Sequence, residues 1–230
     1  MHPMPNRETE VKIRIADVKV VQKQLRKIGF RLRHSRSLED NTLFDTPDRK
    51  LRKVRSILRL RHYGRRWVLT YKGTPSPDRF YKSRVEIETE IEKPQVLRSL
   101  FAVLGLQPVF RYQKYRRHYA PPSRKGQKGD LRKTVLRKAA PGGIVLDETP
   151  IGDFLELEGS RRWIDRVARQ LGYSRRDYST SSYGALYLEE CRKKNIPPGD
   201  MLFSRRGYRK KKTGARPPSG STKHGRRKTS

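Results

Sequence analysis

The chain has 230 residues, of which 33% are hydrophobic and 34% charged, and its formal net charge is +33 at neutral pH. No apolar run approaches the roughly 18 residues of a membrane-spanning helix. The N-terminal segment also lacks the apolar core of a secretory signal, so we expect a cytoplasmic protein that does not enter a membrane. The single cysteine, Cys191, excludes an internal disulfide framework and argues against a cysteine-based zinc site.

The basic excess is concentrated in two segments. Residues 121–143 carry a net charge of +6 and residues 192–230 carry +13, whereas the rest of the chain carries +14 and holds 21 of the 23 acidic residues. We therefore expect one domain over residues 1–195, with an exposed basic insertion at 121–143 and a disordered tail at 196–230. Residues 121–143 and 200–230 would contact RNA or polyphosphate weakly and without sequence preference.

The first half of the chain is predicted to contain four strands and one helix. Residues 8–15 alternate charged and apolar side chains, which is typical of a strand. Asp17 can cap a helix that has Val21 and Leu25 on one side and ends at Gly29. Further strands are predicted at 56–63, 66–73 and 83–91, with a turn-rich loop at 73–79.

The second half is predicted to contain three helices and three more strands. One helix begins at Pro94 and ends at Gly105, and another is capped by Ser160 and ends at Gly172. Strands are predicted at 110–119, 143–148 and 154–159, and a weaker helical pattern covers 182–193.

The charged faces of these strands are sorted by sign. Residues i and i+2 of a strand share a face about 6.6 Å apart. Shared faces are expected for Glu8, Glu10, Lys12 and Arg14; for Arg59 and Arg61; for Glu86, Glu88 and Glu90; for Lys114 and Arg116; and for Glu156 and Glu158. One interpretation is an antiparallel sheet with its charges in water, but blocks of like charge are mildly destabilising there.

The other interpretation is a barrel whose charged faces line an interior channel and whose apolar faces are covered by the helices. Carboxylates bind hard cations such as Mg²⁺ or Mn²⁺, whereas Lys and Arg bind phosphate oxygens. A channel with both kinds of wall therefore predicts a metal-bound polyphosphate substrate.

A series of motifs, in order along the chain, resembles one known family. The motifs are "ETEVK", "LFDTPDRKL" with "LRLR", "WVLTYKG", "SRVEIETEI", "KYRRHY", "IVLDETPIGDFLELEG" and "SSYGALY". Together they resemble the CYTH domain of the triphosphate tunnel metalloenzyme superfamily, over about residues 7 to 190. Known members include class IV adenylate cyclases and thiamine, inorganic and RNA triphosphatases.

The resemblance implies an α+β fold in which a closed antiparallel barrel of eight strands forms a tunnel with flanking helices. It implies Mg²⁺ or Mn²⁺ held by Glu8, Glu10, Asp147, Glu156 and Glu158. The catalytic set would be Glu8, Glu10, Lys12, Glu86 and Glu88. The triphosphate would be bound by Lys12, Arg59, Arg61, Lys72, Arg84, Lys114 and Arg116.

One departure affects the phosphate contacts. Many members carry a basic residue just before the closing Ser-Tyr, where this chain has Thr180 and Ser181. Either that contact is missing or Arg175 or Arg176 replaces it.

Three functions remain open from the sequence. We favour hydrolysis of a triphosphate, either inorganic triphosphate, thiamine triphosphate or a nucleoside triphosphate. The first alternative is a class IV adenylate cyclase that converts ATP to cyclic AMP and pyrophosphate. The second is an RNA- or polyphosphate-binding protein without turnover. The sequence does not predict the oligomeric state.

Overall fold

The computed structural model describes residues 6–121 and 142–204. Most of the expected insertion, residues 122–141, and the expected tail from residue 205 onward lie outside the described residues. Within the described part of the chain, no helix is long and apolar enough to cross a membrane.

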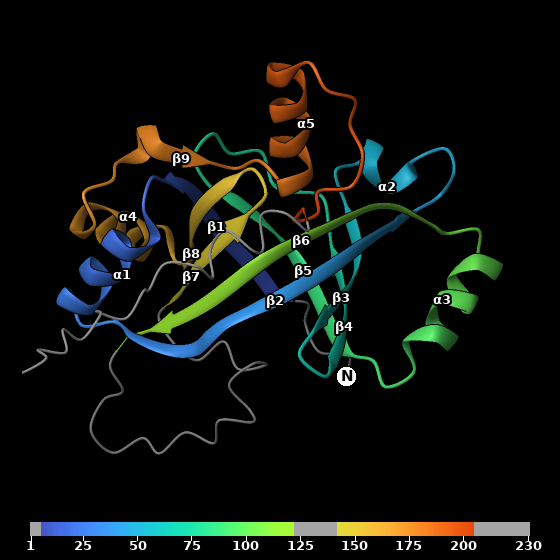
Figure 1. Ribbon diagram of the computed structural model, residues 1–230, viewed down its shortest axis with the longest axis horizontal. Helices are drawn as coiled ribbons and strands as arrows, with labels where there is room; N and C mark the ends of the chain where they lie inside the picture. The colour runs from blue at the N-terminus through green and yellow to red at the C-terminus, as the bar shows by residue number, and fades with distance from the viewer. Residues whose placement is uncertain (1–5, 122–141, 205–230) are drawn as a thin grey trace, which may run out of the picture.

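Eight strands close into one antiparallel barrel (Figure 1). They are β1 (Asn6–Ile15), β2 (Arg31–Asp45), β3 (Ile57–Tyr63), β4 (Arg66–Lys72), β5 (Lys82–Glu90), β6 (Gln107–Ala120), β7 (Gly142–Thr149) and β8 (Gly152–Gly159). The strand order is β5-β4-β3-β2-β6-β7-β8-β1, and β1 pairs back to β5, with Glu8 opposite Arg84. This confirms the expected fold class. A two-residue strand, β9 (Tyr178–Ser179), also pairs with β1.

Five α-helices flank the barrel in the described residues: α1 (Val18–Lys27), α2 (Lys50–Lys53), α3 (Pro94–Val103), α4 (Arg161–Gln170) and α5 (Tyr183–Lys194). The expected caps are present. The Asp17 carboxylate accepts a hydrogen bond from the backbone N–H of Lys19 at 2.6 Å, and the Ser160 hydroxyl accepts one from Trp163 at 3.3 Å. A short 3₁₀ helix, η1 (Arg175–Asp177), precedes β9.

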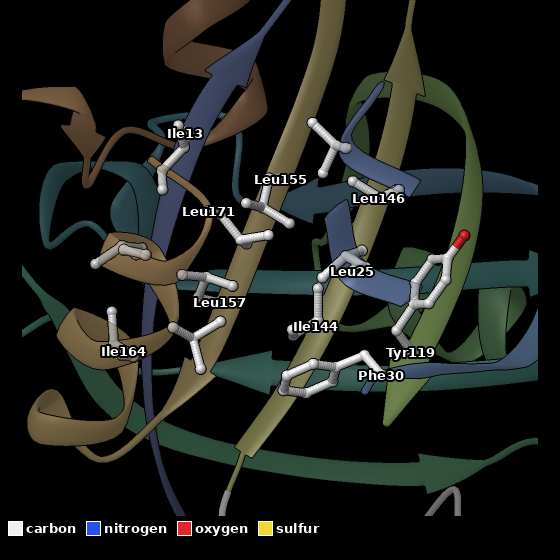
Figure 2. Packing of buried hydrophobic residues seen from close by; sticks show 14 of the residues in the cluster. Ile13, Leu25, Phe30, Tyr119, Ile144, Leu146, Leu155, Leu157, Ile164 and Leu171 are labelled. Carbon is white, nitrogen blue, oxygen red and sulfur yellow. The ribbon is translucent and has the colours of Figure 1, made fainter. Parts of the chain in front are cut away.

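The main apolar core lies outside the barrel (Figure 2). Outward residues of β1, β7 and β8, such as Ile13, Ile144 and Leu157, pack against Leu25 of α1 and Ile164 of α4, and all five are fully buried. The alternating strands thus turn their apolar faces toward the helices and their charged faces into the barrel. This arrangement confirms the channel interpretation over a sheet with its charges in water.

The long strand β2 was not predicted from the sequence. Its first half contains exposed arginines rather than alternating apolar residues, and its pairing with β6 is interrupted between Leu32 and His34 and again between His34 and Ser37. These bulges break the period of two on which strand prediction depends.

Residues 199–203, which we name the C-terminal strap, lie against β6. The Met201 backbone forms two hydrogen bonds with β6. Its N–H donates to the carbonyl of Arg111 at 3.0 Å, and its carbonyl accepts from the N–H of Gln113 at 2.9 Å. The Met201 side chain is buried in a cluster with Tyr112 and Tyr183. This part of the expected tail is therefore packed onto the barrel.

Candidate active site

A cavity of about 1510 Å³ lies inside the barrel and is lined by charged side chains. All seven expected phosphate-binding residues line it: Lys12, Arg59, Arg61, Lys72, Arg84, Lys114 and Arg116. So do six of the expected carboxylates: Glu8, Glu10, Glu86, Glu88, Glu156 and Glu158. Residues from strands far apart in the sequence thus converge on one space because the barrel closes.

The first group of charges joins β1, β4 and β5. The Lys72 ammonium contacts Glu8 and lies 3.0 Å from Glu86. Burial raises the pKa of Glu8, and the nearby carboxylates of Glu10 and Glu86 add to the rise against the opposing effect of Lys72. Burial also disfavours the ionised form of Glu86, but Lys72 outweighs it and lowers the pKa of Glu86 to about 2. Glu8 and Glu86 therefore share the ammonium of Lys72.

The second group joins β1, β5 and β8. The Lys12 ammonium lies 3.0 Å from Glu10 and 3.1 Å from Glu156, and Lys82 lies 3.4 Å from Glu10. Burial opposes the charge on Lys12, but Glu10 and Glu156 outweigh it and raise its pKa. Lys82 has the opposite balance, because burial and the nearby Lys12 lower its pKa to about 7.

The third group surrounds Asp147 on β7. Asp147 is fully buried and accepts hydrogen bonds from Lys114 at 2.8 Å, from Arg116 Nε at 2.7 Å and from the Tyr183 hydroxyl at 2.7 Å. Its carboxylate lies behind the cavity wall rather than among the lining residues. Of the five expected metal ligands, Asp147 is the one that the structure sets apart from the other four.

Two arginines in the wall have unsatisfied donors. The Nε atoms of Arg59 and Arg84 are buried and have no hydrogen-bond partner among the described residues. Arg84 is 4% exposed and forms no ion pair with any described residue, whereas Arg59 donates to Thr70 at 3.0 Å. Buried donors without partners are costly, so this part of the wall is prepared for an anion that would accept from them.

The structure adds three residues to the site that the sequence did not assign. Lys82 and Glu39 line the cavity, and Tyr183 at the start of α5 lies beneath Lys12 and Lys114, whose ammonium groups are 5.3 and 4.9 Å from its ring centroid. Lys82 could have been found, because it shares the alternating face of Arg84 and Glu86. Glu39 could not, because its strand was not predicted.

The suggested replacement of a phosphate contact by Arg175 or Arg176 is wrong. Arg175 lies on the surface, where it bonds to Asp165 at 2.6 Å, and neither arginine lines the cavity. Both belong to the exposed η1 turn, which is capped by Ser174. Lys82 is an additional cation that does face the cavity.

The lining carboxylates fit a hard divalent cation in their chemistry. Glu8, Glu10, Glu156 and Glu158 supply only oxygen donors, as Mg²⁺ and Mn²⁺ prefer. In the described residues, however, no group of three or more His, Cys, Asp or Glu side chains is arranged to hold a metal ion. Lysines and arginines occupy the positions between the carboxylates instead.

One end of the barrel is closed by α5 and the C-terminal strap. Tyr183 packs on Tyr112 and Phe154, and the Tyr187 hydroxyl donates to the strap carbonyl of Asp200 at 3.3 Å. At the other end, where β2 begins and β6 finishes, His34, His118 and Gly143 line the cavity. The fold and site together define an antiparallel tunnel with a charged interior, closed at one end by a helix.

Comparisons with known proteins agree with this class. The CYTH domain family model matches residues 6–183, and the chain belongs to the CYTH family. It is 33% identical over 153 residues to the Methanocaldococcus jannaschii protein MJ0240, named as a candidate adenylate cyclase, with 66% of this chain and 77% of that protein covered.

Solved structures share the fold. PH1819 from Pyrococcus horikoshii OT3 has a TM-score of 0.61 and 25% identity, covering 80% of this chain and 99% of that chain. HpAC1 from Hippeastrum, described as a candidate adenylyl cyclase with a dominant triphosphatase activity, has a TM-score of 0.55 and 20% identity, with 80% and 96% covered. The family comprises enzymes, and the expected family assignment is confirmed.

Proposed function

We propose that the protein is a Mg²⁺- or Mn²⁺-dependent hydrolase of a triphosphate bound inside the barrel. The observation that carries the proposal is the burial of Arg84 without an anionic partner among the described residues. A guanidinium that is 4% exposed and has no ion pair with the described residues calls for an anionic partner. A triphosphate would supply that partner and would also accept from the buried Nε of Arg59.

The remaining cations surround the same space. Lys12, Lys72, Lys114, Arg61 and Arg116 reach it from β1, β4, β6 and β3, so a chain of phosphates would meet donors from several directions. Each of these five is paired with a carboxylate in the structure, for example Lys12 with Glu10 and Glu156. A triphosphate would compete with those carboxylates for the same donors.

This competition couples substrate and metal. As phosphate oxygens take over Lys12 and Lys72, the carboxylates of Glu8, Glu10, Glu156 and Glu158 become available as metal ligands. Bound Mg²⁺ or Mn²⁺ would stabilise charge on the phosphate oxygens and lower the pKa of a bound water. We therefore expect each ligand to tighten the other by a coupling free energy of about 1–3 kcal/mol.

The protein's own groups would act mainly by positioning and electrostatics, as is general for phosphoryl transfer. Arg59, Arg61 and Arg84 would orient the phosphates from β3 and β5. Arg116, locked by Asp147 and Glu156, offers a guanidinium that does not need to reorganise when the substrate arrives. Glu86 and Glu88 lie on the strand beside Glu8 and would orient the attacking water.

The test is a substrate panel with product identification. Tripolyphosphate, thiamine triphosphate and ATP are each incubated with Mg²⁺, with Mn²⁺ and with a chelator. The proposal predicts metal-dependent release of inorganic phosphate from at least one of them. Titration calorimetry of the metal with and without a non-hydrolysable triphosphate measures the predicted coupling.

Adenylate cyclase activity is the second candidate, because the M. jannaschii relative is named for it. Both reactions require the metal and the phosphates to be bound in the same way. They differ in the attacking oxygen and in the phosphorus that it attacks. Formation of cyclic AMP and pyrophosphate from ATP, without inorganic phosphate, would replace the hydrolase proposal with this one.

A binding protein without turnover is the third candidate. It predicts that no product forms from any triphosphate with either metal, although tripolyphosphate still binds. Under that outcome Glu156→Gln and Glu158→Gln would leave binding in the presence of metal unchanged, which the hydrolase proposal does not allow.

A further inference from the structure

Two helices on one side of the barrel present a surface of unpaired cations. Eight cationic residues are exposed on α1 and α4, and one of them, Arg161, pairs with Asp78 at 2.7 Å. The other seven are Lys19, Lys23, Arg26, Lys27, Arg162, Arg166 and Arg169. We name this set the basic face. None of the seven forms an ion pair with a described residue. Asp165 is the one acidic residue in the two helices. Its carboxylate accepts hydrogen bonds from Arg175 and from the hydroxyls of Tyr81 and Tyr178.

The two helices form one surface. They lie side by side over the barrel (Figure 1), and their apolar residues belong to the same core cluster. The ring centroids of Phe30, just after α1, and Trp163 of α4 are 6.2 Å apart. The cations of both helices therefore point to solvent from the same side of the molecule.

The spacing of the cations is regular. In each helix they follow one face at i, i+4 and i+7, as in Arg162, Arg166 and Arg169. At about 1.5 Å per residue, successive cations are separated by about 4.5–6 Å along the helix axis. Each helix thus presents a row of positive charge about two turns long.

Arg26, Lys27 and Arg169 lie in the last turns of their helices, where a cation is favourable, but the repulsion along each row opposes helix stability. Like charges at i, i+4 destabilise a helix by a few tenths of a kcal/mol per pair. The last helix shows the stabilising alternative, because in α5 Lys193 pairs with Glu189 at 2.7 Å and Lys194 with Glu190 at 2.9 Å. Cations without acidic partners on α1 and α4 point to a partner outside the chain.

We propose that the basic face binds a double-stranded nucleic acid through its phosphate backbone. A single strand would call for aromatic side chains on which bases stack, but Phe30 and Trp163 are buried under the helices. A membrane would call for an apolar face turned outward, but Val21, Leu25 and Ile164 are turned to the barrel, and Val20 is the one large apolar residue that these helices expose. Two neighbouring rows of cations without either feature suit a regular array of phosphates.

The test uses the full chain and a short DNA duplex with 5′-hydroxyl ends, which offers no triphosphate to the tunnel. Two triple variants neutralise the rows: K19Q/K23Q/R26Q on α1 and R162Q/R166Q/R169Q on α4. The matched control, K50Q/R52Q/K53Q, removes the same charge from the exposed cations of α2. Circular dichroism and tripolyphosphate turnover check that every variant keeps its fold and its tunnel.

Affinity is measured by fluorescence anisotropy over a range of salt concentrations. Each lost phosphate contact should reduce the slope of log K against log salt by about 0.9, so a row variant should lose up to about 3 and bind at least ten-fold more weakly near 0.1 M salt. The control should keep its slope within about one.

Three results would overturn the proposal. The row variants could bind the duplex like the parent protein, or the control could lose as much affinity as they do, which would leave only non-specific attraction to net charge. The row variants could also lose binding to single-stranded DNA or to phosphatidylserine vesicles while duplex binding stays intact. That pattern would assign the basic face to a different partner.

Discussion

The role of Asp147 can be tested by removing its charge alone, with Asp147→Asn. In the structure this carboxylate is fully buried and accepts from Lys114, Arg116 and Tyr183 at 2.7–2.8 Å. Removing one partner of a buried ion pair costs about 3–5 kcal/mol, because the other charge stays buried without compensation.

The structure places the expected cost at the lower end of that range. Lys114 keeps a second carboxylate, Glu39, at 3.5 Å, and Arg116 keeps Glu156. The amide of asparagine also retains one oxygen that can accept from Tyr183. We therefore expect the free energy of unfolding to fall by about 3 kcal/mol, which lowers Tm by roughly 6–12 °C in a domain of this size.

The assay is urea unfolding followed by the fluorescence of Trp67 and Trp163, with Tm from circular dichroism. The matched control is Glu88→Gln, because this carboxylate is 26% exposed and lies 3.8 Å from Arg59, its one ion-pair partner among the described residues. Its loss should cost under about 1 kcal/mol. If Asp147→Asn abolished turnover while its stability stayed within about 1 kcal/mol of the parent, the anchoring role argued here would be refuted and a direct role at the metal favoured.

The remaining predictions concern three other side chains. Glu156→Gln should lower metal-dependent turnover at least 100-fold yet strengthen metal-free tripolyphosphate binding several-fold, because Lys12 and Arg116 lose a competitor; unchanged turnover would exclude Glu156 as a ligand. Tyr183→Phe should cost about 1–3 kcal/mol of stability by urea unfolding, since a 2.7 Å hydrogen bond to Asp147 is lost, and an unchanged midpoint would show that the hydroxyl is dispensable. Burial, and then Arg116, lower the pKa of His118 to about 4, so the folded state binds this proton less well than the unfolded chain. Stability should therefore be complete above about pH 6.5 and fall toward pH 4, and His118→Asn should flatten that part of the curve; an identical pH profile for the variant would contradict this.

The sequence predicted those elements whose residue spacing alone indicates which side chains are buried and which face the cavity. Asp17, Ser160 and the apolar residues behind them define α1 and α4, and the caps are present as expected. The sorted charges of β1, β3, β5, β6 and β8 predicted a lined interior, and the cavity contains those residues. Both depend on spacing within a single element, which the sequence displays directly.

The rest depends on relations between elements. Strand β2 was missed because its bulges and exposed arginines are stabilised by pairing with β6, whose paired residues lie 62 to 89 positions further along the chain. Asp147 follows its strand pattern as any ligand would, and only the approach of Lys114, Arg116 and Tyr183 shows that it is enclosed. Arg175 was misplaced because a cation near a motif in sequence can still belong to a turn that faces solvent.

The placement of the main core outside the barrel has a consequence for how such proteins diverge. Along each strand, alternate positions have different roles. Outward residues such as Ile13 and Leu155 pack against the helices, and inward residues line the cavity. Except where a charge is locked as firmly as Asp147, an inward position can change its chemistry while the outward contacts persist. Successive substitutions at inward positions could therefore change the substrate while every intermediate sequence still folds.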